Sequence, residues 1–401
     1  MHSCEKQFIE CISAAIRGYK INTICDREVD WLEVFKKAED HNVKPLVYSS
    51  LRNDIYKIND KLFNDVKRYT ILASVLQIQH MKQVEKVFKE FNDNKISVIG
   101  LKGAALRNLY PRPEFRTMSD LDLLVRKGDI ENSEKILLKL GYVRFGITKN
   151  HLSFKHKRFL NIDLHWTIDD KRGEGNVSDL ENEIWNNTIK MSIGQASFLS
   201  LSWEDMLIHL LIHMAGHVVY SGFGIRQMCD VVLVIERKGH LINWESFYNK
   251  IRTIRIEKLM VVVFMACKSL FGMEVPEIVN NRIKDENENL NKFINYICLG
   301  GVYGRKDFAS VYGGKLAFNI YNHNLKYIII TMKQIISQIV KAIFPHIKKI
   351  YEEFPYSKRC TVLLPVAWVH YISRHILRAK SIIFFIPMSI NRYRLFKYLN
   401  L

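Results

Sequence analysis

The sequence predicts an α+β protein in which a small mixed sheet lies between an N-terminal helical segment and a large C-terminal helical region. Apolar residues recur at helical spacing in the N-terminal part, for example from Phe63 to Phe91, and again in most of the chain after residue 200. Between residues 95 and 170 the pattern changes to short units that alternate between strand and helix. This change of period places the sheet in the middle of the chain.

These patterns divide the chain into four parts. We expect a helical segment over residues 1–93, a sheet-containing core over 94–198, a helical domain over 199–320 and a basic helical tail over 321–401. Within the core, we expect a hairpin from Ser153 to Ile168 and a loop at 171–175. The 401 residues are enough for more than one hydrophobic core.

The composition is that of a globular protein, with 48% hydrophobic and 25% charged residues. Seven scattered cysteines include no Cys-x-x-Cys pair, which predicts reduced thiols and no zinc ribbon. The N-terminus contains Glu5 and Glu10 and no long apolar run, unlike a signal peptide. Because no stretch of about 18 uninterrupted apolar residues occurs, we expect no transmembrane span and a cytoplasmic protein.

Two aspartates one residue apart are the most informative feature of the chain. They lie in the apolar run that ends at Val125. A β-strand alternates its faces, so Asp120 and Asp122 share one face, while Leu121 and Leu123 share the other, where a helix can cover them. Like charges on one face repel each other, and a hard divalent cation such as Mg²⁺ removes this conflict. A solvated acidic strand face is the alternative interpretation of the spacing alone.

A third carboxylate comes from a later strand. In residues 161–168, Asp163 and His165 share one strand face and apolar residues share the other. If this strand lies beside the first, Asp163 approaches Asp120 and Asp122. Three carboxylates around two cations, about 3.5–4 Å apart, suit phosphoryl or nucleotidyl transfer, because the ions hold the attacking and leaving oxygens in line. As a lone residue, Asp163 would be an ordinary surface aspartate.

A Lys-Gly turn precedes the paired aspartates. Lys102 and Gly103 follow the apolar run at 97–100, and residues 104–110 have helical spacing. A glycine at this position lets the backbone approach a phosphate, and a helix N-terminus offers free N–H groups. Lys102 would add positive charge. The turn is neither a Walker P-loop nor a Rossmann fingerprint, and a purely structural turn is the alternative.

Taken in order, the turn, the Asp-x-Asp strand and the single later Asp resemble the DNA polymerase β-type nucleotidyltransferase superfamily. More narrowly, several segments resemble its bacterial uncharacterised nucleotidyltransferase family. These segments are Leu101–Leu106, Leu109–Pro111, Arg116–Val125, Gly141–Tyr142, Asp163–Trp166, the helix Leu207–Glu236, Ala38–Val47 and Leu363–Trp368. The resemblance covers most of the chain.

The resemblance implies an enzyme that binds ATP or another NTP and transfers its nucleoside monophosphate. It implies that Asp120, Asp122 and Asp163 bind Mg²⁺ or Mn²⁺, and that Asp163 also orients or deprotonates the acceptor hydroxyl. It further implies that Gly103 and Lys102 contact the triphosphate. The core at 94–198 would then be catalytic.

The sequence departs from the superfamily pattern around the turn. Ala104 follows Gly103 where the superfamily usually has glycine or serine, so we expect Lys102 or Ser119 to supply the missing phosphate contact. The interval before the Asp-x-Asp strand is also long. It contains arginines, of which we favour Arg116 as a γ-phosphate ligand because it lies four residues before that strand; a solvated loop arginine is the alternative.

The final fifth of the chain carries most of the net positive charge. The net charge is +18, and residues 321–401 contain 13 Lys or Arg and only 2 acids. Interleaved with aromatics, this segment can bind nucleic acid. With Ile382–Ile386 as its apolar face, it can instead lie on an anionic membrane. We favour a third alternative, a packed helical tail with solvated Lys and Arg, in which Trp368, Phe384 and Phe385 are buried.

Three histidines recur every four residues on one helical face. His209, His213 and His217 are not a metalloprotease site, because His-Glu-x-x-His is absent. We favour satisfied core residues or the face with which the helical domain at 199–320 closes a nucleotide pocket opposite the carboxylates; a zinc site is the less favoured alternative, because histidines at i and i+4 can share a metal.

We therefore expect a nucleotidyltransferase that acts on an acceptor hydroxyl or phosphate. The acceptor is a small molecule, a peptide, a protein or an RNA, and the sequence leaves this choice, the base and the oligomeric state open. The alternative is an RNA-binding or regulatory non-catalytic protein that retains the fold. A missing carboxylate would favour that alternative, and all three are present.

Overall fold

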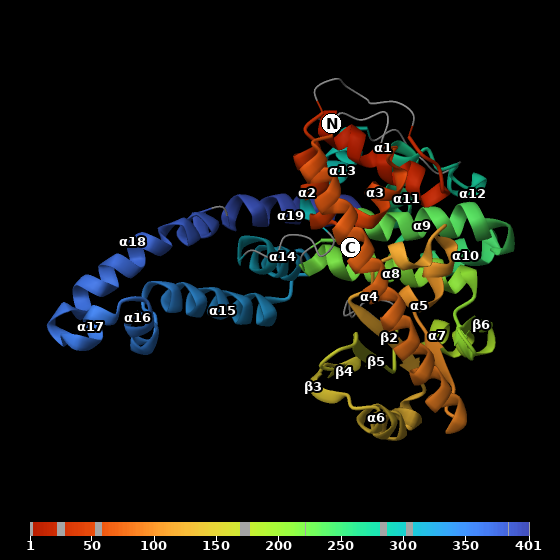
Figure 1. Ribbon diagram of the computed structural model, residues 1–401, viewed down its shortest axis with the longest axis horizontal. Helices are drawn as coiled ribbons and strands as arrows, with labels where there is room; N and C mark the ends of the chain where they lie inside the picture. Colours follow the sequence, from red (N-terminus) through yellow and green to blue (C-terminus); the bar gives the residue numbers. More distant parts are fainter. Residues whose placement is uncertain are drawn as a thin grey trace. The chain divides into compact units, whose positions relative to one another are not determined.

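The computed structural model describes residues 3–21, 29–52, 58–168, 177–220, 222–280, 287–301, 308–383 and 385–400. The chain forms two compact units (Figure 1). Unit 1 comprises Met1–Gly216 and Phe223–Val302, and unit 2 comprises His217–Gly222 and Tyr303–Leu401. Over the described ranges, no helix is long and apolar enough to cross a membrane.

The described part of unit 1 contains one seven-stranded mixed sheet, which confirms the expected α+β class. Its order is β3-β4-β5-β2-β1-β7-β6. The strands are β1 (Val98–Gly100), β2 (Asp120–Val125), β3 (Val143–Ile147), β4 (His151–Lys155), β5 (Asn161–His165), β6 (Ile189–Ile193) and β7 (Ala196–Ser200). β2 pairs in parallel with β5, and β1 with β7, whereas the other neighbours are antiparallel. The expected hairpin is β4–β5, and the loop expected at 171–175 lies outside the described residues.

One face of β2 forms the core of the sheet. Leu121, Leu123 and Val125 are buried with residues of α4 (Asp60–Asp93) and α6 (Ile130–Lys139). Residues between them on β2 therefore point to the opposite face. This confirms that helices cover the leucine face and leave the aspartates on the other side.

Further helices complete unit 1. They are α1 (Ser3–Arg17), α2 (Trp31–Asp40), α3 (Lys44–Ser50), α5 (Gly103–Leu106), α7 (Val177–Asn186), α8 (Trp203–Tyr220, which continues past Gly216), α9 (Ile225–Lys238), α10 (Trp244–Thr253), α11 (Glu257–Phe271), α12 (Glu277–Asn280) and α13 (Asn287–Gly300). Short 3₁₀ turns cover Arg107–Leu109 (η1), Pro113–Phe115 (η2), Lys127–Asp129 (η3) and Gly239–Leu241 (η4). The helix expected at 104–110 is thus α5 followed by η1.

Unit 2 is helical in its described part. It contains α14 (Phe308–Tyr321), α15 (Leu325–Ile343), α16 (Ile347–Glu353), α17 (Pro355–Arg359), the 3₁₀ turn η5 (Thr361–Leu363), α18 (Leu364–Ile383) and α19 (Phe385–Leu399). A small core joins Ile350, Phe354, Ala367 and Tyr371. Trp368 is only half-buried and stacks on Phe344, with ring centroids 5.4 Å apart. Phe384 and the side chains of Phe385 and Ile382–Ile386 lie outside what the structure describes, so their expected burial stays a prediction.

A buried histidine in unit 1 makes folding sensitive to acid. The ring of His41 is 1% exposed. Its Nδ1 accepts from the N–H of Ile225 at 3.3 Å, so the neutral ring donates from Nε2 to the carbonyl oxygen of Cys298 at 3.1 Å. Burial lowers the pKa of His41 from 6.5 to about 4. The unfolded chain therefore binds a proton that the folded chain rejects, and stability falls as the pH drops below the unfolded pKa.

We expect this histidine to lower the free energy of unfolding by about 2 kcal/mol between about pH 7.5 and about pH 5. Urea unfolding of the native protein and of His41→Gln at both pH values measures this loss. The variant is expected to be less stable at the higher pH but to lose about 2 kcal/mol less on acidification. Equal losses in both proteins would contradict the prediction.

Candidate active site

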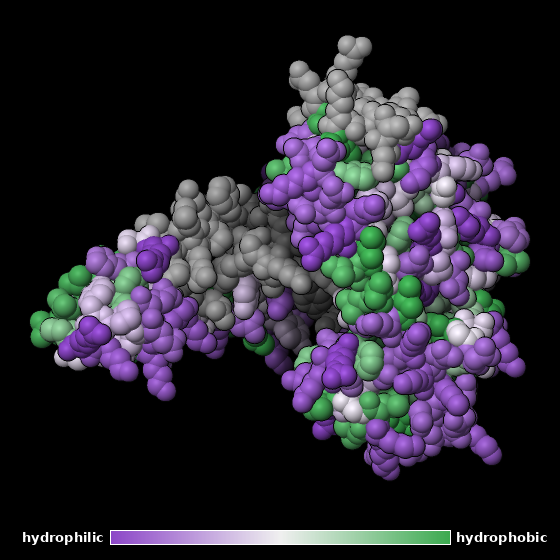
Figure 2. Space-filling model, in the orientation of Figure 1, coloured by the Kyte–Doolittle hydropathy of each residue, from purple (hydrophilic) through white to green (hydrophobic). Residues whose placement is uncertain are grey.

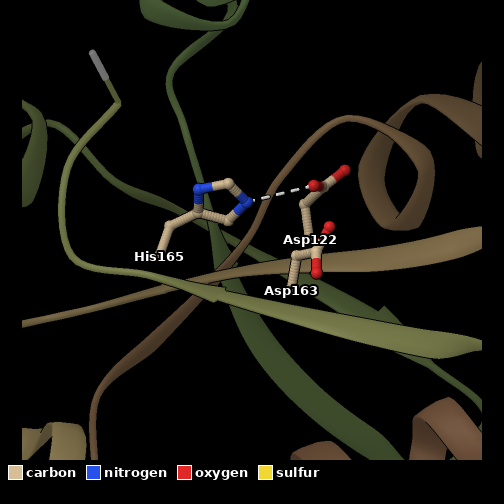
Figure 3. Close-up of side chains that lie close together, drawn as sticks. All are labelled: Asp122, Asp163 and His165. Atoms are coloured by element: carbon tan, nitrogen blue, oxygen red, sulfur yellow. Dashed lines mark hydrogen bonds and ion pairs between the residues drawn. The ribbon is translucent and has the colours of Figure 1, made fainter. Parts of the chain in front are cut away.

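Two adjacent parallel strands bring two of the predicted carboxylates together. The register pairs Asp122 of β2 with Asp163 of β5, so both side chains lie on the face opposite the leucine core. His165 follows two residues later on the same face, and its Nε2 lies 3.2 Å from Oδ1 of Asp122. One ligand atom from each of these three residues lies within 4.8 Å of the others (Figure 3). The three side chains form a donor set suited to a cation.

The neighbouring strand β4 supports this group. Ser153 lies opposite Asp163 in the register, and its hydroxyl donates to Oδ1 of Asp163 at 2.6 Å. His151 lies opposite His165, with ring centroids 4.7 Å apart and its Nε2 3.9 Å from Oδ1 of Asp163. Three adjacent strands thus present one polar face, and Ser153 fixes the orientation of the Asp163 carboxylate.

Asp120 lies at the start of β2, one strand repeat before Asp122. It is half-buried, and the exposed Ser119 donates to its Oδ1 at 3.2 Å. Burial and then the adjacent Asp122 carboxylate raise the pKa of Asp120, although Lys102 and Arg226 oppose this shift. Asp120 is not among the three residues whose ligand atoms converge. It therefore borders the cluster.

Asn in place of Asp120 is expected to stabilise the metal-free protein. A raised folded pKa means that the ionised carboxylate destabilises the folded state above the unfolded pKa, and the neutral amide removes this penalty. We expect a melting temperature above that of the native protein in the presence of a chelator. A lower melting temperature under these conditions would show that the carboxylate has a favourable partner.

Lys102 pairs directly with the carboxylate cluster. Its Nζ lies 3.0 Å from Oδ2 of Asp122 and 3.4 Å from Nδ1 of His213. Burial opposes the charge of Asp122, but Lys102 and then His165 outweigh it and hold the pKa of Asp122 well below its usual range. The backbone of Lys102 has φ 41° and ψ −103°, a conformation that costs energy in a residue with a Cβ. This strained turn directs the ammonium group at the acids.

Gly103 has a packing reason to be glycine. A Cβ at this position would lie 2.8 Å from Cε of Met118 and 3.0 Å from Nη1 of Arg116, so the end of the Met118 side chain would have to shift to admit it. The residue is buried at the start of α5. Close packing against Met118 and Arg116 thus disfavours a larger residue here, and the expected contact of Gly103 with a triphosphate stays a prediction.

Arg116 is buried in an ion pair with α9. Its Nε and Nη2 donate to Oδ1 and Oδ2 of Asp230 at 2.8 and 2.7 Å, and the hydroxyl of Tyr110 also donates to Oδ1 at 2.8 Å. Arg116 is 6% exposed. A γ-phosphate contact would require this pair to break, so the structure does not place Arg116 as a phosphate ligand. The pair instead fixes the segment before β2 against α9.

Three residues near the acids were not among the predicted site residues. Period-two alternation placed His165 on the strand face of Asp163 but gave it no role in the site. His213 belongs to the histidine face of α8 and reaches Lys102. Arg226 of α9 donates from Nη1 to the carbonyl oxygen of Thr117 at 2.9 Å and lowers the pKa of Asp120. A position of His213 opposite the carboxylates was one of the alternatives that the sequence left open, whereas Arg226 is identified only by the fold.

The three histidines on one face of α8 have different environments. His213 contacts Lys102, as a face that closes a pocket over the carboxylates would require. His209 is 5% exposed, and neither ring nitrogen has a hydrogen-bond partner among the described residues. Burial, then Lys102, hold the pKa of His209 well below its usual value, so its ring is neutral. His217 is half-buried at the start of unit 2.

A match to a family model agrees with the resemblance seen in the sequence. No curated protein matches the chain. Among solved structures, it is similar to the antibiotic-resistance factor ANT(2'')-Ia, known from a solution structure, with 14% identity over 44% of this chain and 92% of that chain and a TM-score of 0.35. A family model described as "Uncharacterised nucleotidyltransferase" matches residues 27–272, more than half of the chain. The chain therefore belongs to this nucleotidyltransferase family.

Proposed function

We propose that this protein transfers a nucleoside monophosphate from an NTP to an acceptor hydroxyl or phosphate, with pyrophosphate as the leaving group. The acidic group on β2 and β5 supports this proposal most strongly. Two parallel strands in register place Asp122 beside Asp163, and His165 adds a third donor atom. Two carboxylates side by side repel each other, and nucleotidyl transfer requires such a pair to hold its cation.

The donor set fits a divalent cation. Carboxylate oxygens suit Mg²⁺ and Mn²⁺, and an imidazole nitrogen favours Mn²⁺ over Mg²⁺. Asp122, Asp163 and His165 would hold the ion, with Asp120 at the border of the site. When bound, such a cation neutralises the phosphates and the charge that develops on the transferring oxygens.

The residues of the chain then have distinct roles. Asp163 would orient the acceptor hydroxyl and accept its proton on a carboxylate oxygen, with Ser153 fixing the side chain. Lys102, which already neutralises Asp122, would shift its ammonium group towards the incoming triphosphate. Arg226, beside Asp120, would add a second positive charge. No role in the chemistry is needed from Arg116, whose guanidinium is paired with Asp230.

Labelled nucleotides test the proposal. The protein is incubated with cell extract, Mg²⁺ or Mn²⁺, and each NTP labelled in turn at the α- or the γ-phosphate. We expect α-label to appear on an acceptor while γ-label leaves in pyrophosphate, and we expect Asp163→Asn to abolish the transfer. Transfer of γ-label would indicate a kinase instead. Absence of any transfer by the native protein, with every NTP and both ions, would favour a non-catalytic protein that retains the fold.

Removal of the lysine amine is expected to weaken nucleotide binding. Lys102→Ala should raise KM for the NTP by about tenfold to a hundredfold, because a charge-assisted contact to phosphate is lost. The effect of this variant on kcat should be smaller than its effect on KM. Lys102→Gly is the matched variant, since it also removes the amine but tolerates the positive φ. If both variants keep the native KM, the lysine serves only to neutralise Asp122.

A further inference from the structure

An exposed apolar stripe runs along α15 in unit 2. Its members recur at helical spacing and are 41–69% exposed; they are Leu325, Ile329, Met332, Ile336 and Val340. At 1.5 Å per residue the stripe is about 22 Å long. Five large aliphatic side chains in one exposed row are more than the isolated apolar residues of an ordinary surface.

The stripe is not the face by which α15 packs in its own unit. Thr331 and Ile335 are each 4% exposed and lie on another side of the helix. The amide of Asn319 in α14 donates to the hydroxyl of Thr331 at 3.0 Å. These contacts attach α15 to α14 and leave the stripe directed away from them.

Positive charge borders the stripe. Lys326, Lys333 and Lys341 of α15 are exposed, and so are Lys348 and Lys349 of α16. The sequence of α15 contains no Asp or Glu. The surface therefore combines a continuous aliphatic row with lysines and no compensating acid on the helix.

We propose that α15 binds the surface of an anionic membrane, with the stripe in the boundary between headgroups and acyl chains and the lysines at the anionic headgroups. A helix with an aliphatic face and a lysine-rich border is typical of such binding. Among the described residues no helix is long and apolar enough to cross a membrane, so the proposed binding is to the membrane surface.

Other occupants fit this surface less well. Single-stranded nucleic acid stacks its bases on aromatic side chains, whereas the stripe is aliphatic. A second copy of the chain would bring like-charged lysines together around the shared apolar face. Lipid satisfies both parts of the surface, because its acyl chains accept the stripe and its headgroups accept the lysines.

The elements that follow α15 also expose apolar residues. Figure 2 shows apolar residues gathered at the end of unit 2 that α16 and α17 form. Phe344 and Ile347, which follow α15, are exposed, and Val362 of η5 is 82% exposed. These residues add apolar area to the end of the unit that carries Lys348 and Lys349.

Vesicle sedimentation of the full chain tests the proposal. The vesicles contain phosphatidylcholine alone or phosphatidylcholine with phosphatidylglycerol. We expect binding to the anionic vesicles, weakened by salt, and little binding to the neutral ones. The stripe variant Ile329→Gln with Ile336→Gln should weaken binding by on the order of tenfold or more. The charge variant, in which Lys326, Lys333 and Lys341 become Gln, should weaken it by on the order of a hundredfold.

Matched variants in unit 1 serve as controls. Ile71→Gln with Val75→Gln removes two exposed aliphatic residues from α4, and Gln at Lys82, Lys86 and Lys89 removes three exposed lysines from the same helix. Both are expected to bind like the native protein. Equal losses in the α4 and α15 variants would overturn the assignment to α15. So would binding to neutral vesicles alone, binding to single-stranded RNA without binding to vesicles, or a dimer that the stripe variant dissociates.

Discussion

Asn in place of Asp122 is expected to lower kcat for nucleotidyl transfer by about a thousandfold, which corresponds to about 4 kcal/mol of transition-state stabilisation. Asp122 contacts both His165 and Lys102, so it connects the donor set to the lysine that precedes α5. An amide is a poor cation ligand and carries no charge to retain the lysine. The measurement is the initial rate of α-label transfer at saturating NTP and cation.

Two companion variants separate loss of chemistry from loss of folding. Asp122→Asn also removes the partner of the Lys102 ammonium, so its melting temperature must be compared with that of the native protein. Asp163→Asn leaves the Lys102 pair intact and should show a similar loss of kcat. Asp65→Asn, at an exposed position on α4, should retain native activity. Native kcat in either cluster variant would refute the assignment of the site to β2 and β5.

Local periodicity was sufficient to predict the two strands that carry the site. Alternation placed Asp120 and Asp122 on one face of β2 and its leucines on the other, and the structure has this arrangement. The same rule placed Asp163 and His165 together on β5. These predictions succeeded because side-chain direction in a strand depends only on position along the strand.

Contacts between distant segments could not be predicted in this way. Lys102 meets His213 across 111 residues of sequence, and Arg116 meets Asp230 across 114. Arg116 lies close to the Asp-x-Asp strand in sequence, and for that reason it was expected to bind phosphate. A buried acid from α9 pairs with it instead, and nothing near Arg116 in the sequence indicates that partner.

The two strands beyond β1 in the sheet, β7 and β6, were not predicted from the sequence. β6 lies within the predicted core and β7 crosses its end at residue 198, but neither was assigned as a strand. Most of β6 is half-exposed or exposed, so it lacks the continuous apolar run that marked β1 and β2. β7 is fixed by its parallel pairing with β1, a contact across about 100 residues.

The buried pair between Arg116 and Asp230 carries the largest expected effect on stability. Asp230 is 2% exposed and accepts from both Arg116 and Tyr110. Although burial opposes the charged guanidinium, Asp230 raises the pKa of Arg116 above its ordinary value, so the arginine stays charged. Asp230→Asn therefore leaves a buried positive charge without its counterion.

We expect Asp230→Asn to lower the free energy of unfolding by about 3–5 kcal/mol, as is typical when one partner of a buried ion pair is removed. Arg116→Met alone should also destabilise, because it leaves the Asp230 carboxylate unpaired. The double variant should be more stable than the two losses added together, since it buries no lone charge. Urea unfolding of the four proteins measures this coupling, and additive losses would show that the pair contributes nothing specific.

The same pair fixes the segment before β2 against α9, so the single variants should also lower activity. The double variant should recover part of this activity if apolar contact alone holds the segment in place.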